Sequence, residues 1–276
     1  MSRIAIIGYG FVGKAVEFGF NNSQNEILIV DPYKGYASIE ALDDFSPDFT
    51  FVCVPTPMNN AGGIDAGTIN EVIKQLQLMA CGTVVIKSTV TPDIAKKLCR
   101  YKRFVYNPEF LTERNALNDF IMPQFHILGG RPEFTKKVKN LYQYQSSCNP
   151  APFHYMTVEE ASLVKYGINS FLAMKVMWFN QWKELTENVG ARYSIVSNSI
   201  GSDPRIGHSH TKVPGPDGKK GYGGSCFPKD TNAILDFAPD VLTILNEVVR
   251  SNNAARSEYS LDDREAEQKV FFKKNE

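Results

Sequence analysis

Apolar runs and polar stretches alternate over the first 150 residues of the chain. Six runs have the length of a buried strand, and several of them end at glycine or proline. These runs are Arg3–Ile7, Ile27–Val30, Phe49–Val54, Thr83–Ile86, Phe104–Tyr106 and His126–Leu128. The segments between them predict helices at Gly13–Phe20, Thr68–Met79, Pro92–Arg100 and Pro132–Tyr144. Strands that alternate with helices predict an α/β fold, a Rossmann-like doubly wound parallel sheet with helices on both faces.

The second half of the chain has a helical pattern. From Thr157 to Asn188, apolar residues recur at three-to-four spacing, which predicts one helix of about 45 Å. Thr157 and Glu160 have the spacing of a capping box at its start. Further helices are expected at Ser194–Ile200 and Thr231–Asn253. The pattern therefore predicts an all-α domain with one long central helix.

These patterns divide the chain into three parts. We expect the Rossmann-like domain at residues 1–152 and the helical domain at residues 153–258. Residues 259–276 are rich in charge, which predicts a charged tail that frays.

Composition narrows the class of protein and its partners. Of 276 residues, 43% are hydrophobic and 22% charged, as in packed globular proteins. The 30 Lys and Arg balance the 30 Asp and Glu, so neither nucleic acid nor an anionic membrane surface is expected as a partner. No apolar run approaches the roughly 20 residues of a membrane span. The apolar start enters a glycine cluster without a signal-peptide cleavage site.

The five cysteines are scattered, and no two of them form a CxxC pair. This spacing argues against a disulfide framework and against a zinc site. We therefore expect reduced thiols in a cytoplasmic protein that holds no metal.

A glycine motif follows the first predicted strand and opens the first predicted helix, in the order Gly8-Tyr9-Gly10-Phe11-Val12-Gly13. Gly8 permits a tight turn, Gly10 lets the backbone approach a pyrophosphate, and Gly13 lets helix and strand pack closely. Asp31 ends the second strand, where a carboxylate binds ribose hydroxyls and repels a 2′-phosphate. In this context the motif predicts an NAD site at these residues, Phe11 and Val12 included, rather than ordinary glycine turns with a helix-capping aspartate.

Two later strand ends are expected at the same site. Val54-Pro55-Thr56-Pro57 follows the third strand, and Lys87-Ser88-Thr89-Val90 follows the fourth. Ligands of doubly wound sheets lie over the carboxyl ends of the strands, so both loops should border the NAD. Either loop alone would carry little weight, because proline-rich loops and Ser/Thr caps are common strand exits.

A second glycine loop, Gly221-Tyr222-Gly223-Gly224-Ser225, is followed directly by Cys226-Phe227-Pro228-Lys229-Asp230. If Pro228 starts a helix, Cys226 lies just before its N-terminus, where the dipole and nearby lysines favour the thiolate. This environment indicates a nucleophile. A glycine-flanked cysteine is also often inert, so the interpretation needs support from other motifs.

Two pairs of polar residues offer that support. Pro108 is expected to start a helix that places Glu109 and Glu113 one turn apart, and paired carboxylates can divide acid–base work. Lys165 and Asn169 share a face of the long helix and could both hydrogen-bond one oxyanion. The alternatives are a solvated helix start and the polar stripe of an amphipathic helix.

With these residues in view, the chain resembles the UDP-glucose/GDP-mannose dehydrogenase family. The matching motifs, in order, are Gly8–Gly13, Val54–Pro57, Lys87–Val90, Asn107–Glu113, Lys165–Asn169, Asp203–Gly207 and Gly223–Asp230. The resemblance implies NAD as cofactor and oxidation of the 6-hydroxymethyl group of a nucleotide sugar, UDP-glucose to UDP-glucuronate first among them. It also implies a homodimer formed through the long central helix. The family's C-terminal nucleotide-binding domain is expected to be missing from the chain.

The resemblance further implies roles for the catalytic residues. Cys226 is implied as the nucleophile that forms a thiohemiacetal and then a thioester, with Asp230 as its acid–base partner. Glu109 is implied as the acid–base residue of hydrolysis, Lys165 and Asn169 as the oxyanion clamp.

The remaining implied roles concern binding. Thr89 would position the sugar end or a water, and Glu113 and Lys229 would border the cofactor. Arg205 would reach the sugar nucleotide of a neighbouring subunit. Further substrate contacts are implied at Phe110, Leu111, Glu113, Tyr222 and Gly223.

Other interpretations remain open. A β-hydroxyacid dehydrogenase also joins a Rossmann domain to a long helix with a Lys-x-x-x-Asn pair, but it removes one hydride and needs no thiol. A non-catalytic alternative is a truncated NAD-binding dimer, without turnover or dependent on a partner chain. The basic loop between Arg205 and Cys226 could bind a diphosphate through Lys212, Lys219 and Lys220, or could simply be solvated.

Overall fold

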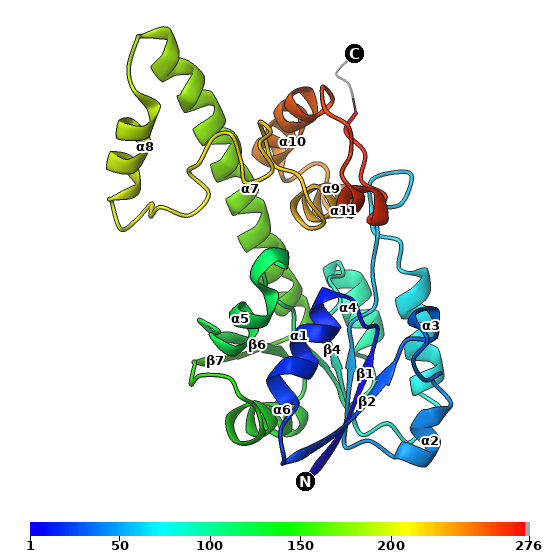
Figure 1. Ribbon diagram of the computed structural model, residues 1–276. Helices are drawn as coiled ribbons and strands as arrows, with labels where there is room; N and C mark the ends of the chain where they lie inside the picture. Colours follow the sequence, from blue (N-terminus) through cyan, green and yellow to red (C-terminus); the bar gives the residue numbers. More distant parts are fainter. Residues whose placement is uncertain (274–276) are drawn as a thin grey trace. The chain divides into compact units, whose positions relative to one another are not determined.

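The computed structural model describes residues 1–273, which form two compact units (Figure 1). The first unit comprises residues 1–56 and 65–165, and the second comprises residues 57–64 and the chain from residue 166 onward. The division expected at residue 152 therefore falls later, between Lys165 and Tyr166. The reason is that the segment after residue 152 adds a strand to the sheet of the first unit and starts a helix that packs on it. The last three residues of the expected charged tail lie outside the described residues.

The first unit is built on a seven-stranded sheet in the order β2-β1-β3-β4-β5-β6-β7. The strands are β1 (Ser2–Ile7), β2 (Asn25–Val30), β3 (Phe49–Val52), β4 (Thr83–Ile86), β5 (Phe104–Tyr106), β6 (His126–Gly129) and β7 (Phe153–Met156). The Rossmann-like fold is confirmed, with two differences. The sheet is mainly parallel, because β6 pairs antiparallel with β5, and strand direction cannot be deduced from an apolar run. The strand β7 was not expected, because two of its four residues are exposed and its pattern is only weakly apolar.

Helices cover both faces of this sheet (Figure 1). Along β1, Ile4 and Ile6 point to one face, while Ala5 and Ile7 point to the other, and all four are buried. The face of Ile4 and Ile6 packs against α1 (Phe11–Phe20), α5 (Ala116–Ile121) and α6 (Pro132–Gln145). The opposite face packs against α2 (Ala41–Phe45), α3 (Gly67–Leu76), α4 (Pro92–Leu98) and the start of α7 (Val158–Asn188). The short helices α2 and α5 had no sequence signal strong enough to predict them.

The second unit is helical, as expected. Besides most of α7 it contains α8 (Tyr193–Gly201), α9 (Phe227–Phe237), α10 (Thr243–Arg256) and α11 (Asp263–Glu267). The stretch Thr231–Asn253, expected as one helical segment, is interrupted at residues 238–242, which include the helix-breaking Pro239. At the start of α7 the expected capping box is present: the Thr157 N–H donates to Glu160 Oε2 at 2.7 Å, and the Glu160 N–H donates to Thr157 Oγ1 at 3.2 Å.

Among residues 1–273, no helix combines the length and the apolar character that crossing a membrane requires.

The charged tail does not fray as far as the structure describes it. Helix α11 begins with a capping box between Asp262 and Glu265. Glu265 and Val270 are buried, and the Met58 N–H donates to the carbonyl of Gln268 at 2.9 Å. The prediction failed because a charged residue is usually exposed, whereas the Glu265 carboxylate has an ionic partner inside the fold.

Candidate active site

The first glycine motif forms a tight turn between β1 and α1. Gly8 has a φ of +89°, and a Cβ there would lie 2.8 Å from the backbone carbonyl carbon of Cys53 on the neighbouring chain segment. A Cβ on Gly13 would lie 2.1 Å from the Gly8 carbonyl oxygen, so helix and turn are in direct contact. A Cβ on Gly10, by contrast, would meet no atom within 4 Å. The turn therefore leaves open space beside Gly10, at the N-cap of α1.

Asp31 lies at the end of β2 and faces this turn. Its Oδ2 accepts a hydrogen bond from the Tyr9 N–H at 2.8 Å, and Lys34 Nζ donates to the Tyr9 carbonyl at 2.9 Å. The carboxylate is thus fixed to the backbone of the glycine turn at Tyr9, the residue before Gly10. An open glycine cradle, a helix N-terminus and a fixed carboxylate fit a dinucleotide with free ribose hydroxyls.

The strand ends after β3 and β4 are joined to each other. Thr56 Oγ1 donates to the Thr89 carbonyl at 2.8 Å, and Ser88 Oγ donates to the Val54 carbonyl at 2.7 Å. Thr56, Ser88 and Thr89 are buried, whereas Pro55 is exposed. The two loops thus form one hydrogen-bonded rim at the carboxyl edge of the sheet, where the cofactor was expected.

Glu113 lies beside α1 rather than beside Glu109. It belongs to the short 3₁₀ helix η2 (Glu113–Asn115) and lines a groove of about 960 Å³ together with Tyr9, Phe11 and Arg114. The helix expected to start at Pro108 does not form. Glu109 Oε2 accepts the Leu111 N–H at 2.6 Å, so a side chain satisfies this backbone group.

Glu109 and Lys165 form a buried ion pair. Lys165 Nζ lies 2.9 Å from Glu109 Oε1 and also donates to the Glu109 carbonyl at 2.6 Å. The ammonium lies 5.4 Å from the centre of the Phe110 ring. A carboxylate and an ammonium in this contact can exchange a proton, and an ammonium can stabilise an oxyanion. The sequence had not predicted this pair, because it grouped Lys165 with Asn169 and Glu109 with Glu113.

A cavity of about 330 Å³ opens beside this pair, lined by Glu109, Phe110, Leu111, Lys87 and His126 among others. Lys87 Nζ donates to Asn107 Oδ1 at 3.0 Å, and burial lowers the pKa of Lys87 to about 8. A second ammonium, less strongly protonated than usual, thus borders the same cavity as Glu109.

In the second unit, Cys226 is the N-cap residue of α9, and Pro228 occupies the first turn. The expected helix start is confirmed. The thiol is partly exposed, and the Ser225 hydroxyl lies 3.5 Å from its sulfur. Cys53, by comparison, lies in the core, where burial raises the pKa of its thiol to about 12. Cys226 therefore has the exposure and the helix position of a reactive thiol.

Asp230 lies one helical turn after Cys226 and is buried. It accepts hydrogen bonds from Asn169 Nδ2 at 2.6 Å and from Lys229 Nζ at 2.6 Å. Asn169 and Lys165, expected as one clamp, have different carboxylate partners, Asp230 for Asn169 and Glu109 for Lys165.

Three other residues that were expected to contact the substrate differ from one another in exposure. The Arg205 side chain is 87% exposed and pairs with Asp203. Tyr222 is buried with its hydroxyl 3.4 Å from Thr231 Oγ1, so it lies inside the unit. Gly223 is partly exposed, but a Cβ there would lie 2.1 Å from Arg256 Nη2.

The basic loop is tied into the fold. Lys219 Nζ donates to the Ser260 carbonyl at 2.6 Å, and Lys220 Nζ lies 3.4 Å from Glu184 Oε1. These contacts favour an anchored loop over a purely solvated one.

The residues that hold the second glycine loop, above all Arg256 and Glu265, were not predicted from the sequence. A signal was present: Leu245, Val249, Asn252 and Arg256 are buried and follow the three-to-four spacing of a core-facing stripe on α10. A charged residue in such a stripe indicates a buried ionic partner elsewhere in the chain.

Fold and glycine turn together define a dinucleotide-binding protein with a helical second unit. The NAD binding domain model of the UDP-glucose/GDP-mannose dehydrogenase family matches residues 40–146, and the central domain model of the same family matches residues 159–254. The chain therefore belongs to the UDP-glucose/GDP-mannose dehydrogenase family, and NAD is the cofactor of its first unit.

The similarity to individual proteins also supports membership of this family. A UDP-glucose 6-dehydrogenase of Rickettsia bellii is 35% identical over 215 residues, covering 73% of this chain and 48% of that protein. A solved UDP-glucose dehydrogenase from the archaeon Pyrobaculum islandicum matches with a TM-score of 0.73 at 27% identity, covering 91% of this chain and 68% of that chain. The chain thus spans about half the length of the curated relatives it matches.

The fold alone is shared more widely. A 3-hydroxyisobutyrate dehydrogenase from Mycobacterium tuberculosis matches with a TM-score of 0.70 at 14% identity, covering 93% of this chain and 94% of that chain. The choice of reaction therefore depends on the site residues rather than on the architecture.

Proposed function

We propose that the protein is an NAD-dependent nucleotide-sugar 6-dehydrogenase, with UDP-glucose as its first candidate substrate. The observation that carries the proposal is the partly exposed thiol of Cys226 at the N-terminus of α9, one helical turn before the buried Asp230. A single-step dehydrogenase has no use for a thiol in this position. The family and the named UDP-glucose dehydrogenases among the relatives support the substrate class.

The proposed reaction converts a primary alcohol to a carboxylate in two oxidations. NAD held at the Gly8–Gly13 turn would supply the oxidant for both oxidations, so two NAD would be consumed per sugar. The alcohol first loses a hydride from C6 and a proton from its oxygen, which gives an aldehyde. The Cys226 thiolate then forms a C–S bond to C6, because an aldehyde must gain a nucleophile before it can lose a second hydride. The thiohemiacetal formed in this way loses a second hydride from C6 and a proton from its oxygen, which gives a thioester. Water then hydrolyses the thioester, which releases the carboxylate and the thiol.

The contacts of each residue support the role that the family resemblance implies for it. Asp230 accepts or returns the thiol proton, while Asn169 and Lys229 hold its carboxylate in place. Glu109 takes a proton from the attacking water, and the proximity of Lys165 Nζ lets that ammonium stabilise the developing oxyanion. The residues thus divide into a thiol pair and a hydrolytic pair.

Counting NADH tests the proposal. Purified protein with NAD and UDP-glucose should form two NADH per sugar, and Cys226→Ser should abolish the second oxidation. Cys99→Ser, a change of a cysteine outside the site, should still give two. One NADH per sugar in the wild type would favour a single-step dehydrogenase. Absence of NADH with every nucleotide sugar tried would favour a cofactor-binding dimer without turnover.

We also propose that a second copy of the chain covers α7. Phe171, Trp178 and Leu185 are spaced seven residues apart on this helix and are 59%, 41% and 49% exposed. A heptad row of large apolar side chains is typical of a helix that packs against another helix. Light scattering should give twice the chain mass for the wild type and a lower mass for Trp178→Glu. A monomeric wild type would refute the homodimer.

A further inference from the structure

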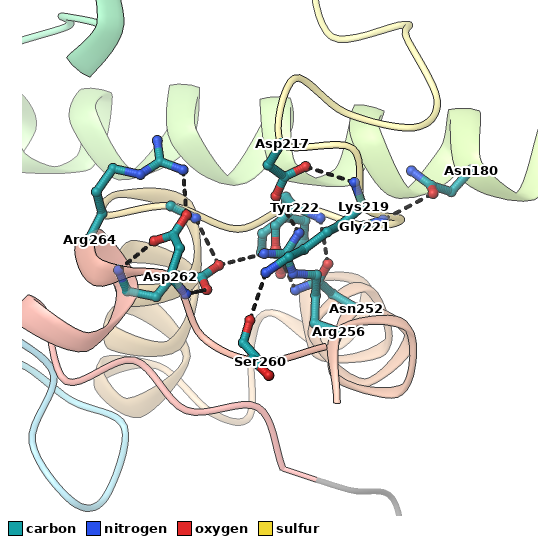
Figure 2. A network of polar contacts seen from close by, with 12 residues as sticks. Asn180, Asp217, Lys219, Gly221, Tyr222, Asn252, Arg256, Ser260, Asp262 and Arg264 are labelled. Carbon is teal, nitrogen blue, oxygen red and sulfur yellow. Dashed lines mark hydrogen bonds and ion pairs between the residues drawn. The ribbon is translucent and has the colours of Figure 1, made fainter. Parts of the chain in front are cut away.

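Side chains from three helices hold the backbone of the second glycine loop (Figure 2). The Gly221 N–H donates to Asn180 Oδ1 of α7 at 3.0 Å, and the Tyr222 N–H donates to Asn252 Oδ1 of α10 at 2.7 Å. The Gly224 N–H donates to Glu265 Oε1 of α11 at 3.1 Å. The position of the loop is therefore set by groups that lie far from it in sequence.

Glu265 is the one charged residue among these three hydrogen-bond acceptors, and both oxygens of its carboxylate accept hydrogen bonds. Its Oε1 also accepts Arg256 Nη2 at 2.5 Å, and its Oε2 accepts the Asp262 N–H at 2.9 Å. Arg256 in turn donates from Nη1 to Asp217 Oδ2 at 2.6 Å. The side chains of Arg256 and Glu265 are 1% and 0% exposed, so the charge of Glu265 depends on Arg256 for compensation, while Arg256 also has Asp217 as a partner.

The hydrogen bond from the Gly224 N–H to Glu265 lies two residues before Cys226 in the chain. Gly224 has a φ of +79° and precedes Ser225 and Cys226, where α9 begins. Glycines impose no conformation of their own, so the loop takes the path that its external partners define. Gly223 lies directly on the ion pair, since a Cβ there would be 2.3 Å from Glu265 Oε1. A change at Glu265 is therefore expected to alter the position of the segment that precedes Cys226.

We propose that Glu265, held by Arg256, is a positioning residue for the Cys226 thiol. It fixes Gly224, and through Gly224 it keeps the sulfur at the N-terminus of α9, where the helix favours the thiolate. The segment after Arg256 then helps to position the Cys226 thiol and is not merely a charged tail. The inference rests on the proposed function of Cys226 as nucleophile.

The test measures the reactivity of Cys226 without cofactor or substrate. Iodoacetamide labelling is followed against pH, and mass spectrometry of the Cys226 peptide separates this thiol from the other four. In Glu265→Gln, labelling at pH 7 should be about tenfold slower, with its pH midpoint shifted upward, because the loop no longer holds the sulfur at the helix end. Glu267→Gln is the matched control, an exposed glutamate of the same helix, and should label like the wild type.

A second variant covers the case in which Glu265→Gln does not fold. Asp262→Ala removes the cap that starts α11 and should give a smaller shift in the same direction. Wild-type labelling profiles in whichever of the two variants fold, with only a lower melting temperature, would overturn the proposal. A shifted profile in a protein that forms no NADH would instead refute the proposed function and leave the positioning role intact.

Discussion

The two units hold their glycine turns in different ways. In the first unit the turn at Gly8–Gly13 is closed by backbone contacts, since Cβ atoms at Gly8 and Gly13 would strike the carbonyl groups of Cys53 and Gly8. In the second unit the loop at Gly221–Gly224 is held by side chains, and a Cβ at Gly223 would strike a charged pair. The first arrangement depends mainly on chain geometry and an apolar sheet, although Asp31 and Lys34 also bind the backbone of Tyr9. The second depends on directed polar groups that include a buried ion pair. The second should therefore be far more sensitive to the loss of one side chain.

The largest expected effect is that of Arg256→Met. It leaves the buried carboxylate of Glu265 without its cation, which should lower the free energy of unfolding by about 3–5 kcal/mol. Both tryptophans, Trp178 and Trp182, lie on α7 in the second unit, so their fluorescence in urea reports the unfolding of that unit. Circular dichroism follows both units together.

Two control variants test whether the loss of stability in Arg256→Met is specific to the buried ion pair. Arg250→Met removes an exposed ion pair with Glu247 on the same helix and should change the stability by less than about 1 kcal/mol. Ile6→Val removes one methylene group from the apolar face of the sheet and should cost about 1 kcal/mol. If Arg256→Met costs no more than either control, the second unit does not depend on its polar network.

A smaller effect should appear in the first unit at acid pH. His126 lies on β6, its ring stacked 4.5 Å from that of Phe153, and burial lowers its pKa from 6.5 to about 4. The unfolded chain therefore gains a proton first, and the free energy of unfolding should fall by about 3 kcal/mol as the pH drops from 7 to 4. His126→Phe keeps the stacked ring and should lose this part of the pH dependence in urea denaturation followed by circular dichroism.

The matched control is His154→Phe, a change at an exposed histidine on the neighbouring strand β7. It should show the same difference in stability between pH 7 and pH 4 as the wild type. Equal pH dependence in His126→Phe and the wild type would mean that His126 is readily protonated inside the sheet.

Much of the first unit could be predicted because its signals are local. Apolar runs predicted six of the seven strands, and the capping box at Thr157 predicted the start of α7. The start of α9 at Cys226 was also predictable, from the position of Pro228. The helix expected at Pro108 was wrong, because Glu109 satisfies the Leu111 N–H and binds Lys165, a residue 56 positions away.

The order of elements in the Rossmann-like fold, the glycine turn with Asp31, the long helix and a thiol at a helix start could all be predicted from the sequence. Each of these depends on residues close together in the chain, where periodicity and backbone sterics act. The pairing of Glu109 with Lys165 and the burial of Arg256 and Glu265 inside the second unit became apparent only in the folded structure. A charged side chain is buried only where a distant partner compensates its lost hydration, and sequence spacing alone does not locate that partner.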